Sequence, residues 1–128
     1  MAEHKILLVE DSEALRVVLA EKLHDEKFEV FEAGGGEEGL KLAEEHRPDV
    51  VITDIVMFPM DGLEMAKRMR EMGAWGENVF IIALTNQNNT EEEERLKDLR
   101  LNAYLVKADT SLDDVVKHVK ELFKKKKK

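Results

Sequence analysis

Val50-Val51-Ile52-Thr53-Asp54 is the stretch that decides the fold, because an unbroken apolar and β-branched run ends there on a single carboxylate. A continuous run of this kind predicts a strand buried on both faces, as in a parallel sheet covered by helices. Asp54 is then expected at the carboxyl end of a central strand. Ligands bind at this edge of open α/β sheets, so the position of the acid predicts a functional site.

Strand and helix signals alternate along the whole chain. Further strands are expected at 5–9, 28–33, 79–84 and 103–106, and helices at 12–25, 37–46, 63–72, 90–99 and from 111 onward, with 73–78 as a loop. Ser12 is expected to cap the first helix, and Ser111 with Asp114 has capping-box spacing. The pattern predicts an α/β fold, a doubly wound five-stranded parallel sheet with helices on both faces in a three-layer sandwich. Residues 1–123 are expected to form one domain and 124–128 a lysine tail.

Composition narrows the class of protein. The chain has 128 residues and no cysteine, which leaves room for one domain without disulfides or thiolate metal sites. The net charge is −8 with the five closing lysines and −13 without them, which argues against nucleic-acid binding by the body. No apolar run approaches the roughly 20 residues of a membrane span. We therefore expect a cytoplasmic protein with no membrane association.

Polar residues directly follow four of the expected strands: Glu10-Asp11, Asp54, Thr85 and Lys107. In a parallel sheet they would gather at one edge. Two like charges 4 Å apart repel by about 4 kcal/mol at an effective dielectric near 20, so three carboxylates need a cation. Lys107 alone does not balance them. A hard divalent ion with oxygen ligands fits this set, and Mg²⁺ is the expected cofactor.

Such a site suits phosphoryl transfer. An aspartate can act as a covalent nucleophile toward phosphorus, and the reaction needs mainly in-line positioning and neutralisation of oxygen charge. Asp54 is the best candidate for the nucleophile because it ends the central strand. Mg²⁺, the Lys107 ammonium and the Thr85 hydroxyl would receive the phosphoryl oxygens.

At these residues the chain resembles the receiver domains of two-component response regulators, the family of the chemotaxis protein CheY. The matching motifs are Ile6-Leu-Leu-Val-Glu-Asp11, Asp54-Ile-Val-Met, Met60-Asp-Gly62, Leu84-Thr85 and Tyr104-Leu-Val-Lys107. The resemblance implies a flavodoxin-like fold and a signalling switch rather than an enzyme. It further implies that a sensor histidine kinase or phosphotransfer protein phosphorylates Asp54 in a phosphorelay.

The resemblance also implies roles for the neighbouring residues. Asp11 would bind Mg²⁺ directly and Glu10 through water, and Asp54 and the Val56 carbonyl would complete the protein ligands. Thr85 and Tyr104 would form a switch pair, in which the hydroxyl moves toward the phosphoryl group and the ring turns inward.

Three positions depart from the family pattern. Phe58 stands where the family usually has proline, and Pro59 comes one residue later. Asn86 follows Thr85 in place of a small residue, and Ala108 follows Lys107 where proline, often after a cis bond, is common. A cis bond before a non-proline residue costs about 3–4 kcal/mol, so we expect a trans or strained bond at Lys107–Ala108 and a changed loop before Ser111.

Three functions compete. The leading hypothesis is a stand-alone receiver without a DNA-binding domain, either a monomer or a phosphorylation-dependent dimer, that signals to a downstream protein target. The alternative is a degenerate receiver that binds proteins independently of phosphorylation. An enzyme on the same architecture is disfavoured, because Glu10-Asp11 stands where a nucleotide or flavin binder needs glycines, and Val56 where a phosphatase needs a second aspartate.

Overall fold

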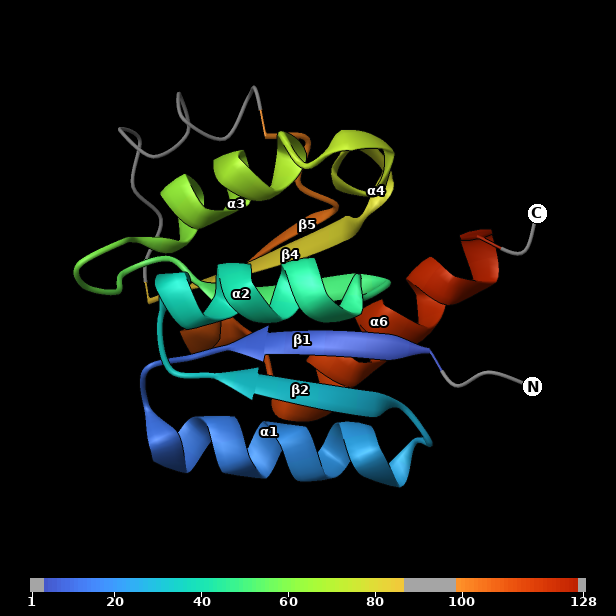
Figure 1. Ribbon diagram of the computed structural model, residues 1–128. Helices are drawn as coiled ribbons and strands as arrows, with labels where there is room; N and C mark the ends of the chain where they lie inside the picture. The colour runs from blue at the N-terminus through green and yellow to red at the C-terminus, as the bar shows by residue number, and fades with distance from the viewer. Residues whose placement is uncertain (1–3, 87–98, 127–128) are drawn as a thin grey trace.

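A five-stranded parallel sheet forms the centre of the molecule in the computed structural model, which describes residues 4–86 and 99–126 (Figure 1). The strands are β1 (Lys5–Val9), β2 (Glu29–Ala33), β3 (Val50–Asp54), β4 (Phe80–Thr85) and β5 (Ala103–Val106). Their spatial order is β2-β1-β3-β4-β5, and every neighbouring pair is parallel. The predicted sheet is confirmed, and β3 lies at its centre.

Helices connect the first four strands in turn, and another helix follows the fifth strand. They are α1 (Glu13–Asp25), α2 (Gly36–His46), α3 (Gly62–Arg70), α4 (Gly73–Asn78) and α6 (Leu112–Lys126), with a 3₁₀ turn, η1, at Lys107–Asp109. The helix expected at 90–99 lies almost wholly outside the described residues. Within 4–86 and 99–126, no helix has the length and apolar character needed to cross a membrane.

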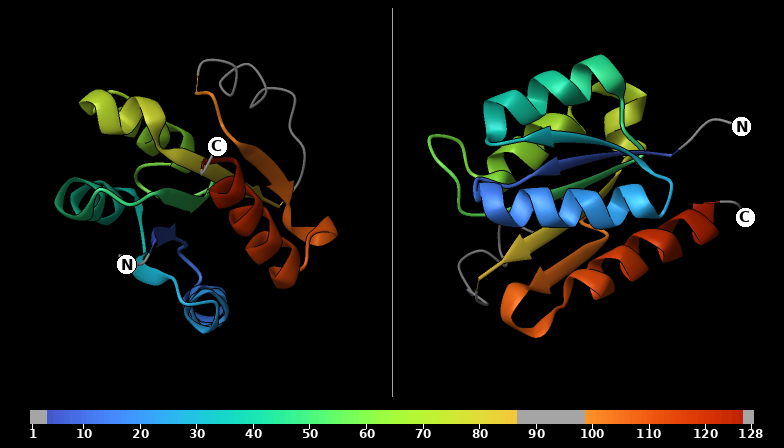
Figure 2. Two further views of the ribbon diagram at one scale, coloured as in Figure 1. Left: turned by 90° about the vertical axis from the view of Figure 1, so that its right-hand side faces the viewer. Right: turned by 90° about the horizontal axis from the view of Figure 1, so that it is seen from below.

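Both faces of the sheet are covered, as the end-on view in Figure 2 shows. Leu7, Val9, Val51 and Ile81 pack with Met65 and Met69 of α3 on one face. Ile6, Leu8, Ile52 and Leu84 pack with residues of α1 and α6 on the other. Because successive side chains of a strand point to opposite faces, a strand between two helical layers is apolar throughout. This arrangement explains the unbroken runs that predicted the strands.

Hydrogen bonds at the helix starts agree with the predicted caps. The Leu15 amide donates to Ser12 Oγ over 3.4 Å at the start of α1. Before α6, the Ser111 amide donates to Asp114 Oδ2 over 3.1 Å, and the Asp114 amide donates to Ser111 Oγ over 3.0 Å, a reciprocal capping box. These caps begin the two helices that flank the acidic edge of the sheet.

The expectation of a loop at 73–78 is wrong, because these residues form α4. Two glycines in six residues and no apolar period leave no helical signal in the sequence. Contacts made in the folded chain stabilise the turn: Trp75 Nε1 donates to the Pro48 carbonyl over 2.7 Å, and the Val79 amide donates to the Trp75 carbonyl over 2.8 Å. Tertiary structure therefore outweighs local propensity here.

Candidate functional site

The two acid-bearing strands are neighbours at the centre of the sheet. Val9 of β1 pairs with Thr53 of β3, so Glu10 and Asp54 leave their strands at the same level. Ligand oxygens of Glu10, Asp11 and Asp54 all lie within 4.8 Å of one another. Glu10 and Asp54 are 2% and 4% exposed, whereas Asp11 is exposed. The predicted carboxylate cluster therefore forms.

Sheet register also brings the remaining predicted residues to this edge. Asp54 pairs with Leu84, so Thr85 lies one residue further along β4, where it is buried. Thr85 in turn pairs with Val106, and Lys107 follows directly. Residues separated by tens of positions in the sequence thus meet because four parallel strands end together.

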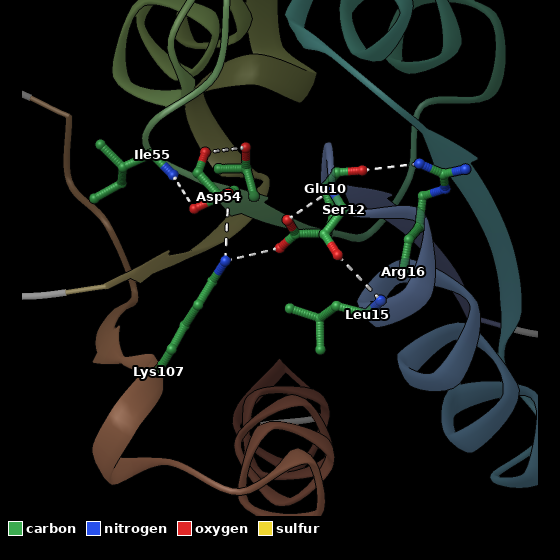
Figure 3. A network of polar contacts seen from close by, with 8 residues as sticks. Glu10, Ser12, Leu15, Arg16, Asp54, Ile55 and Lys107 are labelled. Carbon is green, nitrogen blue, oxygen red and sulfur yellow. Dashed lines mark hydrogen bonds and ion pairs between the residues drawn. The ribbon is translucent and has the colours of Figure 1, made fainter.

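Lys107 joins the two buried acids, as Figure 3 shows. Its Nζ lies 3.0 Å from Glu10 Oε2 and 3.3 Å from Asp54 Oδ2. The other oxygens of these carboxylates accept backbone hydrogen bonds: the Ser12 amide donates to Glu10 Oε1 over 3.1 Å, and the Ile55 amide donates to Asp54 Oδ1 over 2.9 Å. Both carboxylates are thereby fixed in orientation, with one oxygen each directed toward the ammonium.

Burial sets the protonation behaviour of the cluster. Burial raises the pKa of Glu10 above its usual value, although bonds from Ser12 and Lys107 oppose the change. Burial likewise raises the pKa of Asp54, against the opposing charge of Lys107. Burial acts to lower the pKa of Lys107, but contacts with both acids outweigh it, and the pKa lies above its usual value. Lys107 thus stays charged, and it compensates the two acids only in part.

The carboxylates fit a small divalent cation. Mg²⁺ binds oxygen at about 2.0–2.1 Å, so ligands on opposite sides of the ion lie about 4.2 Å apart. The oxygens of Glu10, Asp11 and Asp54 lie within a comparable distance of one another, and all are hard oxygen donors. Burial raises the pKa of both Glu10 and Asp54, so a cation that binds their oxygens would replace hydration that these carboxylates have lost. The donor set therefore suits Mg²⁺.

The start of α3 brings the chain close to Asp54. Asp61 caps the helix by accepting from the Glu64 amide over 2.8 Å, and the Gly62 amide donates to the Ile55 carbonyl over 2.8 Å. A Cβ atom on Gly62 would lie 2.0 Å from the Asp54 carbonyl oxygen. Only glycine fits there, which gives a physical reason for the Met60-Asp-Gly62 motif.

Exposed residues follow the strand ends that carry the cluster, and they include those that depart from the family pattern. Val56 is 51% exposed and Phe58 is 85% exposed in the segment between β3 and α3. Asn86 and Ala108 are also exposed. Among the described residues, the cis peptide bond is Phe58–Pro59. The Lys107–Ala108 bond is therefore trans, which is one of the two forms predicted for it. Residues Lys107–Asp109 form the turn η1.

Tyr104 lies on β5 and is half-buried. It pairs with Ala83, and Ala83 and Thr85 share one face of β4 because side chains alternate along a strand. Tyr104 therefore lies on the same face of the sheet as Thr85, and it packs against the core beneath α3. This placement is compatible with the predicted pairing of the two residues.

Sequence reasoning missed one residue at this edge. Arg16 of α1 donates from Nη1 to the Glu10 carbonyl over 2.9 Å, and its Nε lies 3.3 Å from Glu32 Oε1. An arginine on an amphipathic helix ordinarily indicates a solvated face, and only the assembled sheet brings this one to the site.

Known proteins share both the sequence pattern and the fold. The sequence model of the response regulator receiver domain matches residues 6–120. The chain belongs to the response regulator receiver domain family. Receiver domains are components of two-component signalling systems, and they act as signalling switches.

Two curated relatives show how this receiver domain compares in length. It is 36% identical over 113 residues to the transcriptional regulatory protein PdtaR of Mycobacterium tuberculosis, covering 88% of this chain and 53% of PdtaR. It is 32% identical over 99 residues to sporulation initiation phosphotransferase F of Bacillus subtilis, covering 77% of each. The receiver domain thus spans about half the length of the first relative and most of the second.

Solved structures agree with the fold. The chemotaxis protein CheY4 of Vibrio cholerae has a TM-score of 0.85 and 31% identity to this receiver domain, covering 94% of this chain and 98% of CheY4. A CheY-like receiver domain from Methanospirillum hungatei has a TM-score of 0.90 at 22% identity, covering 98% of each chain, and supports the fold alone.

Proposed function

We propose that this receiver domain is a phosphorylation switch in which a phosphohistidine of a sensor kinase or phosphotransfer protein donates its phosphoryl group to Asp54. The observation that carries the proposal is the Glu10, Asp11 and Asp54 cluster, with Lys107 bridging its two buried members. The similarity to sporulation initiation phosphotransferase F supports a place in phosphoryl transfer.

The orientation of Asp54 favours one oxygen as the nucleophile. Oδ1 accepts the Ile55 amide, whereas Oδ2 is directed toward Lys107. Oδ2 forms the new bond to phosphorus while the bond from phosphorus to the donor imidazole nitrogen breaks. The imidazole leaves with that electron pair and takes up a proton. The hydrogen bond from the Ile55 amide to Oδ1 keeps the Asp54 carboxylate in its orientation throughout the reaction.

Charge around the transferred group comes from two sources. Asp11, Asp54 and the Val56 carbonyl would hold Mg²⁺ directly and Glu10 through water, and the bound ion would supply positive charge to the phosphoryl oxygens. Lys107 supplies a second cation, since its ammonium already lies within 3.3 Å of Asp54 Oδ2. Phosphorylation would draw this ammonium away from Glu10.

The signal then passes to a protein partner. In the proposed switch, the buried Thr85 hydroxyl donates to a phosphoryl oxygen, and Tyr104 moves on the same face of the sheet into the space beside it. The surface of β5 changes as a result. A downstream protein that binds this surface would read the phosphorylated state.

Mass spectrometry after incubation with Mg²⁺ and acetyl phosphate tests the chemistry. We expect one added phosphoryl group on wild type, no addition on Asp54→Asn, and loss of the group in hydroxylamine, which cleaves acyl phosphates. Equal labelling of wild type and Asp54→Asn would refute Asp54 as the acceptor. Mg²⁺ binding without labelling by acetyl phosphate or any kinase would instead favour a phosphorylation-independent binding module.

A further inference from the structure

Arg16 of α1 contacts the acidic site from the side away from Lys107 (Figure 3). Its Nη1 donates to the carbonyl oxygen of Glu10 over 2.9 Å, and its Nε pairs with Glu32 Oε1 of β2 over 3.3 Å. The Arg16 side chain is 20% exposed. One guanidinium therefore connects the segment after β1 to the edge strand β2.

The carbonyl that Arg16 holds belongs to the peptide joining Glu10 to Asp11. The opposite side of Glu10 is also fixed, because its amide donates to the Ala33 carbonyl over 3.0 Å. A peptide unit is planar, so fixing the Glu10 carbonyl also fixes the direction of the Asp11 amide. The backbone on both sides of Glu10 is thus held by β2 and α1.

Two adjacent carboxylates repel when they are directed at one point, and this repulsion favours rotation of the peptide between them. Asp11 is exposed, so burial does not restrain its side chain. Arg16 opposes the rotation with a charged hydrogen bond, which is stronger than a neutral one. The guanidinium is itself fixed by Glu32.

We propose that Arg16 is a positioning residue for the metal site, which holds the Glu10–Asp11 peptide so that both carboxylates are directed toward one divalent cation. The inference rests on the proposed function, because it assumes that the cluster binds Mg²⁺. Arg16 acts through the backbone and contacts neither the cation nor the phosphoryl group. Groups that orient metal ligands typically change metal affinity by 10–100-fold when removed.

Calorimetric titration with Mg²⁺ of Arg16→Met against Arg68→Met tests the inference. Arg68 is a matched control, since it is exposed and pairs with one glutamate, Glu64, over 3.0 Å on α3. We expect Arg16→Met to bind Mg²⁺ about tenfold more weakly than wild type, and Arg68→Met to bind like wild type. A loss of stability in Arg16→Met with unchanged Mg²⁺ affinity of the folded protein would assign Arg16 to the fold alone and overturn the proposal.

Two milder variants serve if Arg16→Met does not fold. Lysine lacks the planar fork with which arginine holds its two acceptors, and Glu32→Gln removes the charge that fixes the guanidinium. Weaker Mg²⁺ binding by both Arg16→Lys and Glu32→Gln supports the proposal, and wild-type affinity in either contradicts it.

Hydrogen exchange in chelator separates the positioning role from the metal site itself. We expect the Asp11 and Ser12 amides to exchange faster in metal-free Arg16→Met than in Arg68→Met. Failure of wild type to bind Mg²⁺ refutes the proposed metal site, whereas equal exchange of these amides in the two variants refutes the role of Arg16.

Discussion

Asp54 is almost fully buried, and Lys107 balances its charge only in part. Its pKa is raised mainly by burial, so the folded state holds a proton more tightly than the unfolded chain does. The contribution of such a group to stability is complete below its unfolded pKa and is lost as the pH rises through the folded pKa. Without a divalent cation, the buried Asp54 carboxyl therefore destabilises the fold once the pH rises above its unfolded pKa.

Asp54→Asn is expected to stabilise the metal-free protein at pH 7.5 by about 1 kcal/mol, the ordinary size of a single-site effect. The stability of wild type should fall from acidic to neutral pH more steeply than that of the variant. Urea denaturation at a series of pH values in chelator measures both. The explanation fails if the variant is less stable than wild type at pH 7.5, or if the two pH profiles are parallel.

Single residues also show what the sequence can and cannot reveal. Glu10, Asp11, Asp54, Thr85 and Lys107 were predictable as neighbours because each follows an apolar run, and parallel strands end at one edge. Arg16 was not predictable in this role. Its partners are a carbonyl six residues back and a glutamate on another strand, and neither contact leaves a pattern in the sequence.

At the scale of elements, α3 can approach β3 only because its first residue is glycine. The close contact of Gly62 with the Asp54 carbonyl leaves no room for a methyl group. We expect Gly62→Ala to cost about 2–3 kcal/mol, in the upper part of the range for overpacked sites, and to weaken Mg²⁺ binding through displacement of Asp54.

Gly35→Ala is the matched control for this prediction. Gly35 is the N-cap of α2 in extended backbone, and a Cβ there would meet nothing within 4 Å. Its replacement should cost at most about 1 kcal/mol, because alanine is a poor N-cap. Urea denaturation compares the two variants, and equal losses would show that the contact with Asp54 has no special cost.

Arg70 at the end of α3 joins three segments. Its guanidinium donates to the carbonyls of Gly76 and Val79 near α4 and of Leu99 and Arg100 before β5, over 2.6–2.9 Å. Sequence reasoning missed this role as well, because the four acceptors are backbone atoms from two other parts of the chain.

Arg70→Met is expected to destabilise the protein by about 3 kcal/mol, since it leaves several half-buried carbonyls without their donor. Arg68→Met should change stability by less than about 0.5 kcal/mol, the value of an exposed pair four residues apart on a helix. Urea denaturation of both variants gives the comparison. A similar small effect for both would mean that water replaces the Arg70 donor without cost.

For the molecule as a whole, the fold was predictable and one short helix was not. Five strands at the expected positions follow from apolar runs, which must be buried on both faces. The segment 73–78 could not be predicted as α4, because contacts from Trp75 to the start of β3 stabilise it. Those contacts exist only after the sheet has formed.

The same contacts place Trp75 at the edge of the sheet opposite the acids. We expect its fluorescence to change little when Mg²⁺ binds and to report unfolding of the whole domain. Mg²⁺ at 100 times its Kd should raise the free energy of unfolding by about 2.7 kcal/mol through binding to the folded state alone. Urea denaturation followed by Trp75 fluorescence measures this increase in the free energy of unfolding.

NaCl at equal ionic strength and Asp11→Asn are the controls for this experiment. Neither NaCl with wild type nor Mg²⁺ with the variant should give the full increase in stability. An equal increase from NaCl would attribute the effect to general screening of an acidic body rather than to the site.

The bond between Lys107 and Glu10 spans 97 positions of the sequence. Contacts of such long range form late in folding, because the entropy of closing the chain must be overcome first, and parallel pairing is slow for the same reason. Until β5 joins the sheet, Glu10 and Asp54 face each other without their cation. During synthesis on the ribosome, the carboxylates therefore emerge well before Lys107, and a nascent chain gains this partial compensation only after β5 has been added.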